Sequence, residues 1–64
     1  MYKNKMREIR ESKGMTLKEL SEKTKITIGY LCHLEKGNRE NPSTEVMEKI
    51  AKALGKSIPE IFFS

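Results

Sequence analysis

The sequence has few of the residues that build disulfides, metal centres and large aromatic cores. Its 64 residues contain no tryptophan, two tyrosines, two phenylalanines and a single cysteine, Cys32. An internal disulfide and a multi-cysteine metal cluster are therefore excluded, and a lone thiol suits a reducing cytosol. His33 is the only histidine, so we expect no metal site and no cofactor.

Long apolar runs are also missing. No stretch approaches the roughly 20 apolar residues of a membrane span, and the first residues lead into mixed charge, unlike a signal peptide. We therefore expect a cytoplasmic protein with no membrane partner. The length suits one domain, residues 1–64, and is too short for a closed catalytic pocket, so we do not expect an enzyme.

Positive charge is present in moderate excess. Thirteen Lys and Arg residues against nine Asp and Glu residues give a net charge of +4. This balance suits contact with a polyanion such as DNA, but it suits a solvated surface equally well. The arrangement of the residues has to decide between the two.

The distribution of turn formers predicts an all-α bundle of about five short helices. Two prolines, four glycines and the lack of alternating β-branched runs argue against strands. The helices are expected at about residues 4–13, 17–24, 28–36, 44–54 and 58–63. Gly14 and Gly55 stand where a left-handed residue ends a helix, and the third helix is expected to end before Gly37.

Polar residues mark where the second and third helices begin. Thr16 and Glu19 have capping-box spacing, in which each side chain accepts a hydrogen bond from the backbone N–H of the other residue. Thr27 is the next N-cap. Further caps are expected at Ser43 and at the pair Ser57 and Glu60. Since only a few residues separate the second and third helices, residues 16–37 are predicted to form a helix-turn-helix.

The third predicted helix has an outward side that its own packing does not explain. Its core side has Leu31 and Leu34, and its opposite arc holds Ile28, Gly29, Cys32, His33 and Lys36. Exposed isoleucine is poorly solvated, and glycine inside a helix costs about 1 kcal/mol relative to alanine. In a DNA major groove the isoleucine could meet a thymine methyl, and the glycine could allow close approach of the backbone. The alternative is that the isoleucine packs under the loop and the glycine avoids a clash.

Five short segments of the chain stand out by their order and spacing. They are MTLKELS at 15–21, IT at 26–27, YLCHLEKG at 30–37, NPS at 41–43 and IAKALG at 50–55. Together they resemble the Cro/C1-type helix-turn-helix family, also called Xre-like or lambda-repressor-like. The resemblance implies a five-helix domain whose third helix enters the major groove of double-stranded DNA, in a small transcriptional regulator that we expect to be a repressor.

The resemblance also implies a set of DNA contacts. The base-reading positions fall on Leu17, Thr27, Ile28, Gly29, Cys32 and His33, and the phosphate-binding positions on Lys36, Asn38 and Arg39. Thr16 and Thr27 are caps first and phosphate contacts second. The alternatives are core packing for Leu17, a turn role for Asn38 and a solvated surface for the two basic residues.

Three further features concern how such a domain would be built. The resemblance implies an ion pair between Arg10 in the first helix and Glu35 in the third. The sequence leaves open whether this pair is exposed or buried. Lys25 stands in the turn where many members have glycine, so either the lysine accepts a strained backbone or the turn differs in shape. The outward arc has no Gln, Asn or Arg, so recognition is expected to depend on thymine methyls and DNA shape.

The last predicted helix is rich in apolar residues. It contains Ile58, Ile61, Phe62 and Phe63. In such a family these residues imply a homodimer on two half-sites about 34 to 36 Å apart. The alternative is that the first three close the core and Phe63 frays.

A rival function for the whole chain is a protein-interaction module, such as an antitoxin or adaptor. No small-molecule ligand is indicated.

Overall fold

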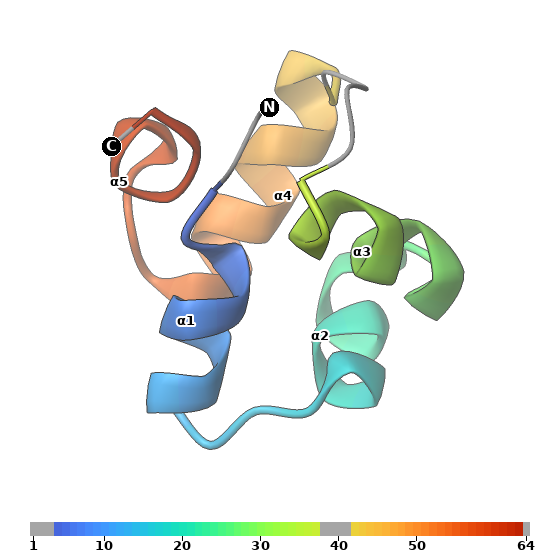
Figure 1. Ribbon diagram of the computed structural model, residues 1–64. Helices are drawn as coiled ribbons and strands as arrows, with labels where there is room; N and C mark the ends of the chain where they lie inside the picture. Colours follow the sequence, from blue (N-terminus) through green and yellow to red (C-terminus); the bar gives the residue numbers. More distant parts are fainter. Residues whose placement is uncertain (1–3, 38–41, 64) are drawn as a thin grey trace.

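The fold is built from short α-helices joined by short loops (Figure 1). The computed structural model describes residues 4–37 and 42–63, and it has no strand within them. The helices are α1 (Met6–Ser12), α2 (Leu17–Thr24), α3 (Ile28–Glu35), α4 (Thr44–Leu54) and α5 (Ile58–Phe62). The predicted all-α class and the order of the helices are confirmed.

Hydroxyl caps define where most of the helices begin. The Glu19 N–H donates to the Thr16 hydroxyl at 3.1 Å, and the Thr16 N–H donates to the Glu19 carboxylate at 2.8 Å. Ser57 and Glu60 form a second capping box in the same way. Single hydroxyl caps are present at Thr27 and Ser43. Each cap satisfies backbone N–H groups that a helix start leaves without an intrahelical partner, so these helix starts are specified locally.

The start of α1 depends on a contact with a distant part of the chain. The Asn4 side-chain oxygen accepts from the Met6 N–H at 3.0 Å, while its amide nitrogen donates to the Leu34 carbonyl oxygen at 2.9 Å. Asn4 therefore lies outside the helix and ties its start to the last turn of α3. For this reason α1 begins two residues later than the sequence pattern predicts.

The turn between α2 and α3 contains the one non-glycine residue of the described chain with a positive φ. Lys25 has a φ of 65° and donates its N–H to the Ser21 carbonyl oxygen at 2.8 Å. Neighbouring hydroxyls hold the turn: Ser21 donates to the Ile26 carbonyl, and Thr24 accepts from the Ile26 N–H. Of the two alternatives for Lys25, the lysine in a left-handed backbone is therefore confirmed.

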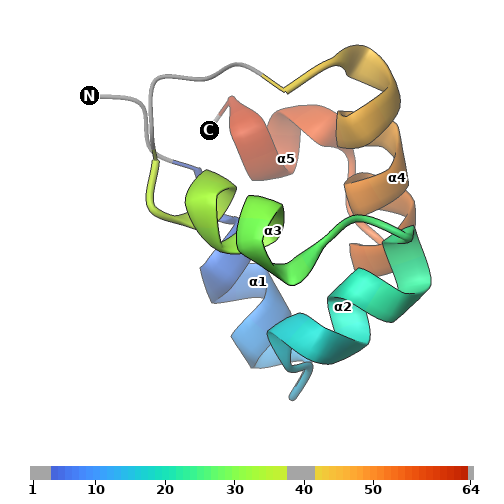
Figure 2. The same ribbon diagram turned by 90° about the vertical axis from the view of Figure 1, so that its right-hand side faces the viewer.

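The core lies where all the helices meet. α2 packs on both α3 and α4, and α5 packs on both α1 and α4. The buried apolar residues are Met6, Leu20, Leu31, Leu34, Ile50, Ala51, Leu54, Ile61 and Phe62. Figure 2 shows the result from the side of α3, which lies in the foreground with α2 below it and α4 at the edge. Among the described residues, no helix combines the length and apolar character needed to cross a membrane.

The apolar residues predicted for a dimer do not share one surface. Ile61 is fully buried and Phe62 is 2 % exposed, so both side chains belong to the core of their own chain. Ile58 is partly buried against that core, and Phe63 is 67 % exposed. Their assignment to a dimer interface needs correction for Ile61 and Phe62, because a five-residue helix can turn these side chains inward against α1 and α4.

Candidate nucleic-acid interface

The outward arc of α3 (Ile28, Gly29, Cys32, His33 and Lys36) faces away from the core. Ile28 is 45 % exposed, and His33 and Lys36 are exposed as well. Cys32 is partly buried. On the other side of the helix, Leu31 and Leu34 are buried. The helix thus has one side used by the fold and one side available to another molecule.

Gly29 has no structural reason to be glycine within the described chain. A Cβ built at this position meets no atom within 4 Å, and the residue does not have a positive φ. The suggestion that Gly29 avoids an internal clash is therefore wrong. The suggestion that Ile28 packs under the loop also fails to account for its exposed side chain.

The start of α3 differs electrostatically from the start of every other described helix. The first turns of the others contain Glu8, Glu19, Glu45 and Glu60. The first turn of α3 contains no acidic residue. A carboxylate there would interact favourably with the helix dipole, but it would repel an approaching anion. α3 therefore presents an N-terminal end suited to a negatively charged partner.

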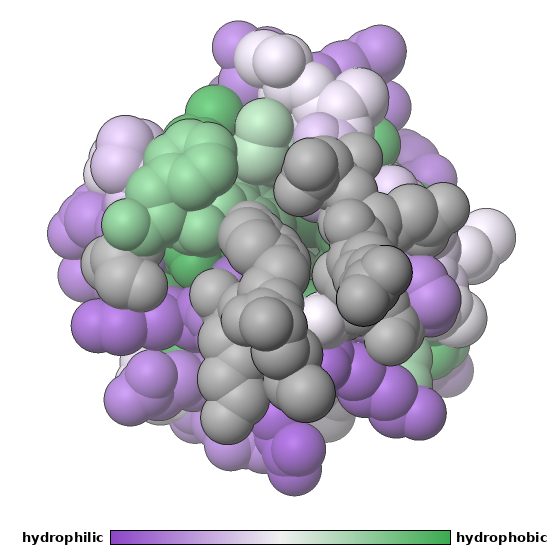
Figure 3. Space-filling model, turned by 45° about the horizontal axis from the view of Figure 1, so that its top comes forward, coloured by the Kyte–Doolittle hydropathy of each residue, from purple (hydrophilic) through white to green (hydrophobic). Residues whose placement is uncertain are grey.

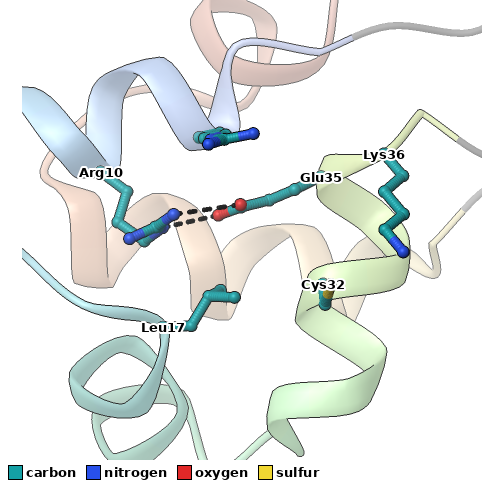
Figure 4. A pocket seen from close by; sticks show the side chains of 6 residues that line it. Arg10, Leu17, Cys32, Glu35 and Lys36 are labelled. Atoms are coloured by element: carbon teal, nitrogen blue, oxygen red, sulfur yellow. Dashed lines mark hydrogen bonds and ion pairs between the residues drawn. The ribbon is translucent and has the colours of Figure 1, made fainter.

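A hollow of about 300 Å³ lies between α1, the start of α2 and the end of α3 (Figure 4). Its lining residues are Arg7, Arg10, Leu17, Cys32, Glu35 and Lys36. Leu17 also packs partly against the core, so it takes part in both the packing and the surface that were alternatives for it. The hollow places the first residue of α2 beside the outward arc of α3.

Arg10 and Glu35 meet across this hollow. The Arg10 Nε donates to Glu35 Oε2 at 2.7 Å, and its Nη2 donates to Oε1 at 3.2 Å. Its Nη1 donates to the Met15 carbonyl oxygen at 2.7 Å. The two side chains are only 10 % and 6 % exposed, so the pair is the buried kind. Its bidentate geometry fixes the last turn of α3 against α1 and the loop that leads to α2.

The pair also holds the guanidinium firmly in its charged form. The hydrogen bond to Glu35 raises the pKa of Arg10, and the negative charge of that carboxylate adds to the effect, while burial opposes it. Because each charge satisfies the other, the two form a rigid support rather than a reactive site.

The remaining predicted contacts fall into three groups. The hydroxyls of Thr16 and Thr27 both serve as helix caps and both residues are exposed. Lys36 follows α3 directly, and none of the ion pairs found among residues 4–37 and 42–63 includes it. Asn38 and Arg39 lie outside the described residues. Sequence reasoning missed the bond from Asn4 to α3, because it placed Asn4 within the first helix.

Acidic and sulfur-containing groups are spread out rather than gathered. In the described part of the chain, no three His, Cys, Asp or Glu residues lie close enough together to hold a metal ion.

Comparison with known proteins gives a consistent picture. A family model described as helix-turn-helix matches residues 6–61. The transcriptional regulator ClgR of Mycobacterium tuberculosis is 41 % identical over 49 residues, which cover 77 % of this chain and 43 % of the relative. The HTH-type transcriptional regulator SinR of Bacillus subtilis is 33 % identical over 58 residues, covering 91 % of this chain and 52 % of the relative. The chain thus spans about half the length of these curated relatives.

A solved structure agrees with both the sequence match and the fold. The crystal structure of the clp gene regulator ClgR from Corynebacterium glutamicum superimposes with a TM-score of 0.77 at 40 % identity. The match covers 86 % of this chain and 57 % of that protein's chain. The resemblance suggested by the sequence segments is confirmed, and the chain belongs to the Cro/C1-type helix-turn-helix family.

Proposed function

We propose that this chain binds specific sites in double-stranded DNA as the DNA-binding part of a transcriptional regulator, with α3 in the major groove. The outward arc of α3 carries the proposal, because it is exposed, partly apolar and contains no carboxylate. A helix of this kind fits the major groove, where base edges and thymine methyls are accessible. The names of the matched relatives, which are transcriptional regulators, support the same function.

Gly29 supports a close approach between α3 and the DNA. Since neither packing nor backbone conformation requires glycine there, the missing side chain leaves room outside the protein. Ile28 beside it offers an apolar contact for a thymine methyl, and His33 can donate or accept a hydrogen bond at a base edge. The base-reading set in this proposal is Leu17, Thr27, Ile28, Gly29, Cys32 and His33.

Contacts to the DNA backbone complete the proposed interface. Lys36 at the end of α3 suits phosphate oxygens. Asn38 and Arg39 extend this set, and the hydroxyls of Thr16 and Thr27 are secondary contacts. Such contacts fix the register of the protein on the duplex without reading sequence, and they make affinity depend on salt.

Repression is the regulatory effect that we propose. A domain seated in the major groove excludes other proteins from the same base pairs, so occupation of a site that overlaps a promoter blocks transcription. A test is to place a selected site within a promoter and to measure transcription with and without the protein. Increased transcription would contradict repression and leave DNA binding intact.

Selection of binding sites from random duplex DNA tests the reading role. The parent chain should enrich one motif, and its affinity should fall steeply as salt rises. Ile28→Ala and His33→Ala should each change the enriched motif. Lys18→Ala, which removes an exposed charge from α2, is the matched control and should keep the motif. Unchanged motifs in both α3 variants would remove α3 from the reading role.

We further propose that two copies act together on a two-fold site. Phe63 is 67 % exposed, and Ile58 at the other end of α5 is only partly buried. Figure 3 shows a hydrophobic area on the side of the molecule where α5 lies. An exposed phenylalanine at the end of the last helix would gain from burial against a second copy.

Sedimentation of the parent and of Phe63→Ser tests the dimer. The parent should sediment as a dimer at micromolar concentration, and the variant should shift toward monomer with little loss of stability. A parent that stays monomeric both alone and on DNA would rule the dimer out.

A protein-interaction module remains the second candidate. The observation in its favour is that the outward arc of α3 has no Gln, Asn or Arg, the side chains best suited to bidentate base contacts. Affinity capture that recovers a tight protein partner, combined with no motif in the DNA selection, would favour this function.

A further inference from the structure

A second concave site lies away from α3, between the end of α2 and the second half of α4. This lysine hollow has a volume of about 290 Å³ and is lined by Lys23, Lys49, Lys52 and Ala53. It shares no residue with the hollow between α1, α2 and α3, and α3 contributes nothing to its lining. In Figure 2, α4 lies at the edge of the view while α3 faces the reader.

The charge of the lysine hollow is largely unbalanced. Lys49 lies 3.7 Å from the Glu45 carboxylate in a solvent-exposed pair, which contributes little. None of the ion pairs found among residues 4–37 and 42–63 includes Lys23 or Lys52. Ammonium groups around one hollow repel one another, so their mutual electrostatics do not stabilise the free protein.

The helix dipole explains only part of the arrangement. Lys23 and Lys52 lie in the last turns of α2 and α4, where a positive charge is favourable. The dipole does not explain Lys49, which lies earlier in α4, nor why side chains of two helices meet around the same space. A bound anion would attract all three ammonium groups and so offset their mutual repulsion.

We propose that the lysine hollow docks an acidic segment of a partner protein. Charge complementarity argues for carboxylates, and the small size of the hollow suits one or two side chains rather than a duplex. Ala53 adds an apolar contact for the methylene groups of a glutamate. Because the site lies outside the outward arc of α3, the acidic segment and DNA bind at the same time.

An NMR titration with an acetylated, amidated peptide of eight glutamates tests the site. At low ionic strength the backbone amides of Lys23, Lys49, Lys52 and Ala53 should shift. The variant K23Q/K49Q/K52Q should weaken binding about tenfold. The matched control K5Q/K13Q/K18Q removes three exposed lysines elsewhere and should bind as the parent does. A peptide of eight glutamines should cause no shift.

Two further variants keep the test decisive. Glu45→Gln frees Lys49 from its carboxylate and should tighten peptide binding about twofold. If the triple variant does not fold, Lys52→Gln alone should still weaken binding measurably.

Three results would overturn the proposal. Equal weakening in the triple variant and its control would mean that only net charge matters. Shifts centred on the outward arc of α3 would move the peptide to the other face. A short DNA duplex that displaces the peptide from the lysine hollow would identify phosphate as its occupant.

Discussion

α4 and α3 both have buried apolar residues at helical spacing, but they differ in what they expose to solvent. α4 buries Ile50, Ala51 and Leu54 along one side, and its exposed positions are mostly charged. α3 buries Leu31 and Leu34 in the same manner, yet it leaves Ile28 exposed and keeps a glycine that nothing in the chain requires. The fold accounts for every apolar residue of α4, because all of them are buried or packed against the core, but it accounts for only half of α3. The unexplained half is where another molecule is expected.

The largest expected effect comes from releasing α3 from its support. Arg10→Ala leaves the Glu35 carboxylate buried without its partner. Removing one member of a buried pair costs about 3 to 5 kcal/mol, a large share of the stability of a small domain. Urea and thermal unfolding followed by circular dichroism should show a large decrease in both midpoints.

An exposed ion pair supplies the control for Arg10. Arg7 pairs with Glu11 at 3.1 Å, but these side chains are 69 % and 55 % exposed. Arg7→Ala should therefore cost at most about 1 kcal/mol. An unchanged melting temperature in Arg10→Ala would show that the buried pair does not hold α3 in place.

The same substitution in the two helices should separate stability from recognition. Ile50→Ala in α4 opens a cavity in the core and should cost about 2 to 5 kcal/mol. Ile28→Ala in α3 should change stability by no more than about 0.5 kcal/mol while weakening DNA binding. The measurements are urea unfolding and titration of a selected duplex. A large stability loss in Ile28→Ala would place that residue in the core and remove the contrast.

Sequence reasoning succeeded where a structure depends on a few neighbouring residues. A Ser or Thr followed three residues later by Glu, just before apolar residues at helical spacing, is a local signal of a helix start, so the capping boxes at Thr16 and Ser57 could be predicted directly. The outward position of Ile28 followed from helical periodicity for the same reason. Local rules thus gave most of the fold and the exposed side of α3.

Features that need contacts between distant parts of the chain were not accessible. The start of α1 depends on Asn4 reaching Leu34, which is 30 positions away. The burial of Ile61 and Phe62 depends on how α5 meets α1 and α4. The lysine hollow exists only because α2 and α4 lie side by side. None of these contacts leaves a periodic signal in the sequence.

Gly29 allows the contrast between the two helices to be sharpened with one methyl group. Gly29→Ala should stabilise the domain by about 0.5 to 1 kcal/mol, because alanine favours a helix and its Cβ meets nothing in the chain. The same methyl should weaken DNA binding if α3 approaches the duplex closely. Gly14→Ala is the control that should destabilise, since Gly14 has a φ of 66°. A Gly29→Ala variant that gains stability and keeps full DNA affinity would exclude close approach at this residue.

The smallest effect concerns acid, and it should weaken the carboxylate cap of α5 while leaving the hydroxyl cap of α3 unchanged. The backbone N–H of Ser57 donates to the Glu60 carboxylate and lowers the pKa of Glu60, with a further bond from the Ser57 hydroxyl. The unfolded chain therefore takes up this proton more readily than the folded one. The stabilisation is complete above the ordinary glutamate pKa of about 4.3 and is lost as the pH falls through the lower folded value. The melting temperature of Glu60→Gln should thus fall less than that of the parent as acid is added. Identical acid profiles would show that this cap adds nothing to stability. α3 has no carboxylate in its first turn, so its cap through Thr27 should be indifferent to this change.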